Sequence, residues 1–213
     1  MLGDEFSEAG KTILREFALF NQSVVFYETR VAPVIDAAIS KHVSEWLKQN
    51  NWKGKTDVSD ELGNLWACPA GWIESDGEEP FAKFYLERQD VNDGDSYEIA
   101  DLFGVGQSKF GFRFHPEHSW FGGKLEWNAT VKGMTKQIEA ITAKGWINEG
   151  KGVLFRPIGM SDEFLVEAWE NEDWSRALAP ITDVLSSIEA DRKLFNAVLY
   201  KANPKSRENR QQC

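Results

Sequence analysis

The sequence predicts an α+β fold with an N-terminal helix pair, a central, mainly antiparallel sheet and C-terminal helices. Apolar residues recur every three or four positions over residues 8–50 and again over 178–199, which indicates helices. Between these stretches, strand-like runs are joined by links of hairpin length, which favours antiparallel pairing. Helices that flank a strand-rich centre are typical of the α+β class.

The domain organisation follows from length and composition. With 213 residues, of which 42% are hydrophobic and 27% charged, the chain can bury a core. We divide it into a helical segment over 1–50 packed on the main domain, an α+β domain over 51–200 and a basic tail over 201–213 that we expect to be mobile. Nine tryptophans and fourteen phenylalanines predict a core of large rings, with a surface that stacks sugars or bases as the alternative.

Residues 8–50 predict two consecutive helices or one kinked helix. Ser7 is expected to cap the first helix, and apolar residues from Ile13 to Tyr27 lie on one of its faces. Pro33 cannot continue the hydrogen-bond ladder, but it can occupy the first turn of a new helix. That second helix runs to about Asn50.

A hairpin is predicted next. Residues 81–88 have the composition of a strand, and Asp93-Gly94 is a strong hairpin-turn signal. Residues 97–103 would return as the second strand. This register places Arg88 diagonally across from Asp101, where the two charges would attract each other.

The rest of the domain continues the pattern. Alternating phenylalanines predict a strand over 110–114, and 121–127 is the expected partner strand after a turn. A helix over about 131–144 would end at Gly145, and another strand would cover 153–156. The run 164–169 fits either a short strand or a first helical turn.

The acidic charge is concentrated in one region. Residues 57–101 hold thirteen acidic side chains and two basic ones, in a chain whose net charge is −10. Such a region repels nucleic acid and attracts basic partners, so we expect a basic protein surface or a nucleic-acid-binding protein as partner. The predicted partner-binding residues are Glu78, Glu79, Asp90, Asp93, Asp95 and Glu98.

Cysteines and apolar runs indicate the compartment. The two cysteines, Cys68 and Cys213, cannot build a disulfide framework. The N-terminus lacks the basic start and apolar run of a secretion signal, and no stretch approaches the roughly 18 apolar residues that span a bilayer. We therefore expect a cytoplasmic protein with no membrane association.

No cofactor or metal is predicted. His115 and His118 are two possible zinc ligands, but zinc needs three or four, so a polar turn is the preferred interpretation. Around Gly94, an EF-hand alignment would require ligands at Gln89 and Val91, which cannot serve. The glycine-rich run 104–111 lacks the lysine and helix of a phosphate loop.

Nucleophilic and carboxylate catalysis have weak candidates. Cys68 lies in an acidic region that raises the pKa of a thiol, so it would be a poor nucleophile. Paired carboxylates beside tryptophans can hydrolyse sugars, although a solvated helix face explains this cluster as well. The cluster consists of Glu167, Glu170, Glu172 and Asp173, among Trp169 and Trp174.

Several elements resemble a known family. Residues 43–52, 81–88, 109–114 and the last helix, within the run from about 30 to 200, resemble the C-terminal accessory region of PD-(D/E)XK-superfamily nuclease-like proteins of bacteria and phages. The resemblance implies a partner-sensing or accessory role in bacteria–phage conflict. Nuclease activity would require Glu/Asp-x-Lys on a strand, and Glu149-Gly150-Lys151 is flanked by glycines that indicate a turn.

Three function classes result. The preferred hypothesis is a non-enzymatic cytosolic protein-interaction or regulatory module with an acidic docking face, such as an accessory protein or inhibitor in bacteria–phage conflict. One alternative is an enzyme with a nonstandard, nuclease- or hydrolase-like carboxylate site. The other is a nucleic-acid-binding accessory protein that uses the basic tail and Lys124 to Lys151; direct nucleic-acid binding is less favoured because the pI is about 4.9.

Overall fold

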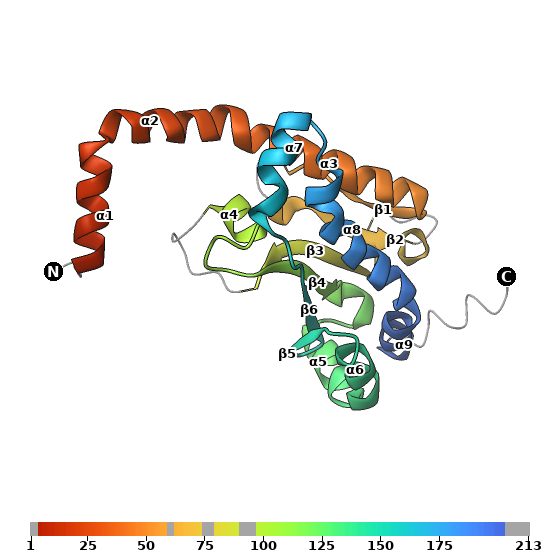
Figure 1. The fold of residues 1–213 in the computed structure, drawn as a ribbon. Helices are drawn as coiled ribbons and strands as arrows, with labels where there is room; N and C mark the ends of the chain where they lie inside the picture. The colour runs from red at the N-terminus through yellow and green to blue at the C-terminus, as the bar shows by residue number, and fades with distance from the viewer. Residues whose placement is uncertain (1–3, 59–61, 74–78, 90–96, 203–213) are drawn as a thin grey trace.

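The computed structural model describes residues 4–58, 62–73, 79–89 and 97–202 and confirms the α+β class (Figure 1). One sheet forms the centre, and helices cover one of its faces. The strands, in sheet order β1-β2-β3-β4-β6-β5 with every neighbouring pair antiparallel, are β1 Trp52–Lys55, β2 Trp66–Pro69, β3 Ala82–Arg88, β4 Phe110–Pro116, β6 Val153–Pro157 and β5 Ile147–Gly150.

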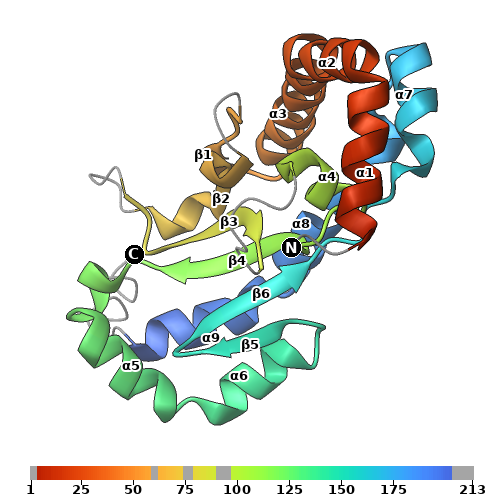
Figure 2. The same ribbon diagram turned by 90° about the vertical axis from the view of Figure 1, so that its left-hand side faces the viewer.

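The core lies between the sheet and three long helices, α3 (Ala32–Gln49), α8 (Ser175–Ala190) and α9 (Arg192–Ala202). In Figure 2 the opposite face of the sheet is turned toward the viewer, with α8 and α9 behind it. Strand alternation sends Phe84 to the covered face, where its ring lies 5.1 Å from that of Phe195.

The predicted aromatic core is confirmed, and tryptophans connect its layers. The indole N–H groups of Trp46, Trp52 and Trp72 donate to Ser186, Glu189 and Asn196 at 3.0, 2.8 and 2.8 Å. Each tryptophan therefore buries its ring, while its indole N–H forms a hydrogen bond with a side chain of α8 or α9.

The predicted hairpin partner is wrong. Residues 98–102 form the short helix α4 (Glu98–Leu102), and β3 pairs with β4 instead, with Phe84 opposite Phe114. β3 pairs with β4 rather than with residues 97–103 because the alternating phenylalanines of β4 extend the apolar surface on the covered face of the sheet. The turn at Asp93-Gly94 lies outside the described residues. Arg88 still meets Asp101, at 3.5 Å, but it reaches Asp101 on a helix.

The predicted strand over 121–127 is also wrong. A 3-10 turn, His118–Phe121, is followed by α5 (Lys124–Lys132), and two glycines with positive φ separate them. Trp127 belongs to α5, and its side chain is fully buried. Its indole N–H donates to the carbonyl oxygen of Lys151 at 2.8 Å. On the edge away from β3, β4 pairs with β6, which the sequence predicts as a strand but without that pairing.

The other predicted elements agree in type with the structure, whereas strands β1, β2 and β5 were not predicted from the sequence. The helix expected over 131–144 is shorter, as α6 (Thr135–Thr142), and the ambiguous run belongs to α7 (Leu165–Asn171). Residues 203–213 of the predicted tail lie outside the described residues.

The N-terminal helices are continuous with one another but unequal in packing. They are α1 (Asp4–Arg15), α2 (Phe17–Phe26), a π-helical turn at Tyr27–Val31 and α3. Ser7 lies inside α1, so it is not the predicted cap. Pro33 stands in the first turn of α3, as expected. α3 buries five residues against the body, whereas α2 buries none and extends away from it (Figure 1).

Candidate partner-binding pocket

Only two of the six predicted partner-binding residues, Glu79 and Glu98, lie in the part of the chain that the structure describes. Glu78, Asp90, Asp93 and Asp95 lie outside the described residues. Glu79 precedes β3 and forms an ion pair with Lys83 at 2.6 Å. Glu98 begins α4, near the other end of β3, a strand that is roughly 20 Å long at ~3.3 Å per residue. Glu79 and Glu98 therefore belong to different surfaces.

Glu98 lines a pocket of about 300 Å³ between the π-helical turn, α3 and α4. Two further carboxylates, Glu28 and Asp36, line the same pocket, together with the rings of Tyr27 and Tyr97. Residues 28, 32 and 36 are spaced four apart, so Glu28 and Asp36 follow one line along the helix with the small residue Ala32 between them. We name this site the acidic pocket.

The aromatic and acidic groups of the acidic pocket touch one another. The rings of Tyr27 and Tyr97 are 5.2 Å apart between centroids. The hydroxyl of Tyr97 donates to Glu28 Oε1 at 3.4 Å. Glu98 accepts from the backbone N–H of Leu62 at 3.0 Å and forms an ion pair with Arg88 Nη2 at 3.5 Å. The pocket thus places carboxylates beside two tyrosine rings.

The charge of the acidic pocket is only partly compensated. Asp36 is half-buried and makes no hydrogen bond or ion pair within the described part of the chain. Burial raises the pKa of Asp36, and the negative charge of Glu98 raises it further. Burial, followed by the charge of Asp36, also raises the pKa of Tyr27. A positive charge placed here would relieve this repulsion.

The geometry favours an organic cation over a metal ion. Within the described ranges, no group of three or more His, Cys, Asp or Glu side chains could hold a metal ion. A lysine or arginine side chain has a longer reach, so it can meet separated carboxylates, and tyrosine faces attract its charge. The acidic pocket therefore suits the side chain of a basic partner.

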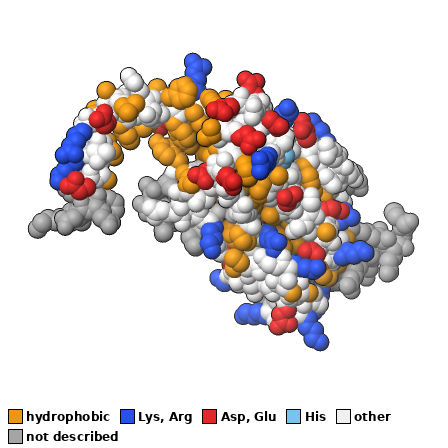
Figure 3. Space-filling view, in the orientation of Figure 1, with side chains coloured by type: hydrophobic (Ala, Val, Ile, Leu, Met, Phe, Trp, Pro, Cys, Tyr) orange, Lys and Arg blue, Asp and Glu red, His pale blue; other side chains and the backbone are white. Residues whose placement is uncertain are grey.

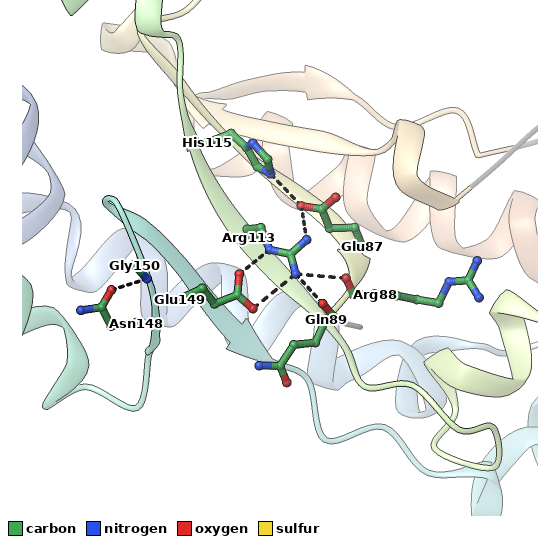
Figure 4. Close-up of polar contacts among 8 residues, drawn as sticks. All are labelled: Glu87, Arg88, Gln89, Arg113, His115, Asn148, Glu149 and Gly150. Atoms are coloured by element: carbon green, nitrogen blue, oxygen red, sulfur yellow. Dashed lines mark hydrogen bonds and ion pairs between the residues drawn. The ribbon is translucent and has the colours of Figure 1, made fainter. Parts of the chain in front are cut away.

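A second ionic cluster lies on the uncovered face of the sheet (Figure 4). Arg113, from β4, pairs through Nε with Glu149 at 2.8 Å and through Nη1 with Glu87 at 2.9 Å. Its Nη2 donates to the carbonyl oxygens of Arg88 and Gln89 at 3.2 and 2.9 Å. Arg113 therefore joins β3, β4 and β5 and uses every nitrogen of its guanidinium.

The same ionic cluster lowers the pKa of Glu87. Burial raises the pKa of this carboxyl, but the hydrogen bond from His115 at 2.7 Å and the charges of His115 and Arg113 outweigh burial and lower it overall. Phe155 lies beneath, with the Arg113 guanidinium 5.3 Å from its ring centroid. Gly111 permits this packing, because a Cβ there would lie 2.6 Å from the Phe155 ring. The cluster therefore holds strands β3, β4 and β5 together.

The predicted catalytic alternatives find little support in the described residues. The turn predicted for the Glu-x-Lys triplet begins only at Lys151, at φ 54°, because Glu149 and Gly150 belong to strand β5. Glu149 is bound by Arg113. Cys68 is buried, and burial raises its pKa to about 12. Glu167 is exposed and forms an ion pair with Arg176 at 3.3 Å.

The two histidines do not share a turn. His115 belongs to strand β4, which corrects the polar-turn prediction, and His118 begins the 3-10 turn that follows. Burial lowers the pKa of His118, and its ring lies 6.1 Å from Trp127. No metal-binding group among the described residues includes either histidine.

Sequence reasoning found Glu98 but missed Tyr27, Glu28 and Asp36. The available signal was the four-residue spacing of residues 28, 32 and 36, which indicates a shared helix face. Their approach to α4 depends on tertiary packing, so no local pattern could reveal it.

Comparisons with known proteins leave the site to be argued from its geometry. No family model, curated protein sequence or solved structure gives a significant match to this chain. In the part of the chain that the structure describes, none of the helices combines the length and apolar character needed to cross a membrane.

Proposed function

We propose that this chain is a protein-interaction module that binds a partner with a basic surface by receiving a lysine or arginine side chain in the acidic pocket. One observation carries the proposal: the half-buried Asp36 carboxylate lies beside Glu98 without a cation from the described residues to compensate it. Taking a charge out of water is costly unless it is paired, and a partner's cation would supply the pair.

The surroundings of the pocket support this partner chemistry. Thirteen acidic and two basic residues within 57–101 give the region a negative field that would speed the approach of a basic partner. A nucleic-acid-binding protein fits because its own binding face is basic. We also propose an accessory or inhibitory role in bacteria–phage conflict, which the resemblance to the accessory region of nuclease-like proteins implies.

Binding of a labelled deca-arginine peptide, measured by fluorescence anisotropy, tests the pocket. We expect Asp36→Asn and Glu98→Gln each to weaken binding by about tenfold, because each removes one charge from the pocket. Glu167→Gln is the matched control: it removes an exposed carboxylate outside the pocket, and binding should change by less than about twofold. Far-ultraviolet circular dichroism establishes that each variant is folded.

Salt and DNA define the outcomes that contradict the proposal. Peptide binding should weaken as the salt concentration rises from about 0.1 M to 1 M, because the Debye screening length falls from ~10 Å to ~3 Å. If Asp36→Asn and Glu167→Gln bind the peptide equally, the pocket is not its site. If the protein shifts a labelled DNA duplex at about 0.15 M salt, the nucleic-acid-binding alternative replaces the proposal.

A further inference from the structure

The N-terminal arm, defined as α1 and α2, exposes an unusual amount of apolar surface. Figure 3 shows hydrophobic side chains gathered along the arm and at its junction with the body. The exposed fractions of these large side chains range from 39% to 71%. They are Ile13, Leu14, Phe17, Leu19, Phe20, Val25 and Phe26.

Seven of the ten residues of α2 are apolar, and the polar Asn21, Gln22 and Ser23 stand in its middle turn. Its hydrophobic residues are not confined to one stripe, and none of them is buried. The stretch from Phe17 to Tyr27 also contains no charged residue. A helix of this composition is ordinarily enclosed by protein, because a single packed face would leave the rest of its apolar surface in water.

An apolar groove of about 380 Å³ runs along the arm where it meets the body. α2 contributes Phe20 and Val24, and the body contributes Ile35, Phe103 and Leu165. No residue of α1 lines it. The arm therefore presents both protruding apolar side chains and an apolar groove that the described chain does not fill.

We propose that the arm of a second copy of this chain occupies this groove, forming a reciprocal dimer about a two-fold axis. In such an isologous contact the same surface serves both copies, so each arm supplies side chains to the other copy's groove. One contact would cover both features at once.

Area and charge support a second copy as the occupant. The seven exposed side chains of the arm present roughly 600 Å² per chain, at ~150–200 Å² for a fully exposed large side chain, and the groove adds to this. A standard interface buries about 800 Å² per partner. Two copies with a net charge of −10 repel each other, and the uncharged stretch from Phe17 to Tyr27 is where they can approach at the least cost.

This inference goes beyond the proposed function and can be tested separately. The carboxylates of Glu28, Asp36 and Glu98 line the acidic pocket and not the groove. Tyr27, Tyr97 and Ile99 line both, so variants that test self-association must avoid these three residues.

Sedimentation equilibrium of the full chain over about 1–100 µM tests the dimer. We expect the unsubstituted protein to be dimeric, and Phe17→Glu or Phe26→Glu to weaken the dimer by at least about a hundredfold, because each places two charges in the symmetric interface. Leu125→Glu is the matched control: Leu125 is 80% exposed on α5, outside the arm, so this variant should remain dimeric. Both phenylalanines are more than half exposed, so the variants should fold, as circular dichroism will verify.

Three results would overturn the dimer. The first is an unsubstituted protein that stays monomeric at about 100 µM. The second is a Phe26→Glu variant that dimerises as strongly as the Leu125→Glu control. The third is a monomer that floats with phosphatidylcholine/phosphatidylglycerol vesicles through the arm, which would make a bilayer the occupant. Deca-arginine binding by the monomeric variants separates the two proposals, since loss of the dimer leaves the acidic pocket in place.

Discussion

The open face of the sheet and the N-terminal arm are both exposed, but only one of them satisfies its own side chains. On the sheet, Arg113 is bound by Glu87, Glu149 and two carbonyl groups, so a dense ionic cluster needs nothing from outside. On the arm, none of the apolar side chains of α2 is buried by the described residues. Side chains that the chain itself leaves unburied or uncompensated are therefore the basis on which we propose binding surfaces, rather than a high density of charge.

The acidic pocket resembles the arm more than the sheet in this respect. Glu87 and Asp36 are both partly buried carboxylates, but cations lower the pKa of Glu87 while burial and a like charge raise that of Asp36. The charges of the ionic cluster on the sheet compensate one another, whereas the pocket and the arm are the surfaces at which we propose partners.

The largest expected effect contrasts a phenylalanine on the covered face of the sheet with one on the arm. Phe84 is fully buried among five aromatic rings, so Phe84→Ala should lower the free energy of unfolding by about 3–5 kcal/mol. Phe17, on the arm, is 59% exposed, and Phe17→Ala should cost less than about 0.5 kcal/mol. Urea unfolding of both in a Phe26→Glu background removes any contribution from a second copy. Equal losses would show that the arm packs against its own chain.

The next effect removes the centre of the ionic cluster. Arg113→Met leaves Glu87 and Glu149 without their shared cation, and we expect a loss of about 2–3 kcal/mol, because both carboxylates remain partly buried. Arg176→Met removes an exposed cation from its pair with Glu167 and should cost less than about 1 kcal/mol. Urea unfolding at neutral pH measures both. Similar losses would contradict the structural role of Arg113.

The smallest effects are opposite pH dependences for the two carboxylates. The pKa of Glu87 is lowered from 4.5 in the folded state, so its contribution to stability is present above pH 4.5 and is lost as the pH falls toward the folded pKa. The pKa of Asp36 is raised from 3.8, so the folded state binds its proton more readily, and this stabilisation is lost as the pH rises through the raised pKa.

Each variant should therefore change the pH profile in its own direction. Glu87→Gln should lower stability at neutral pH and reduce the loss on acidification, whereas Asp36→Asn should raise neutral stability by less than about 1 kcal/mol. Urea unfolding between about pH 3.5 and pH 7 measures both profiles. If Asp36→Asn lowers neutral stability, Asp36 is compensated in the folded protein, and the argument for the acidic pocket fails.

Local pattern explains which predictions of structure succeeded. The apolar spacing of α3, the alternation in β4 and the helical period of α8 and α9 each reflect contacts with one neighbouring layer, so the sequence contains them directly. The hairpin failed because strand pairing is a competition between distant segments. Residues 97–103 had the right composition, but β4 offered a better matched face to β3.

By itself, the sequence determined the α+β class, the aromatic core and the region that carries the negative charge, because periodicity and composition are local properties. Tertiary structure alone decided which side chains share an environment. It joined Glu28 and Asp36 to Glu98 and left α2 uncovered, because burial and compensation depend on what the rest of the chain places nearby. For that reason the same residue type is buried or compensated in one place and exposed or uncompensated in another.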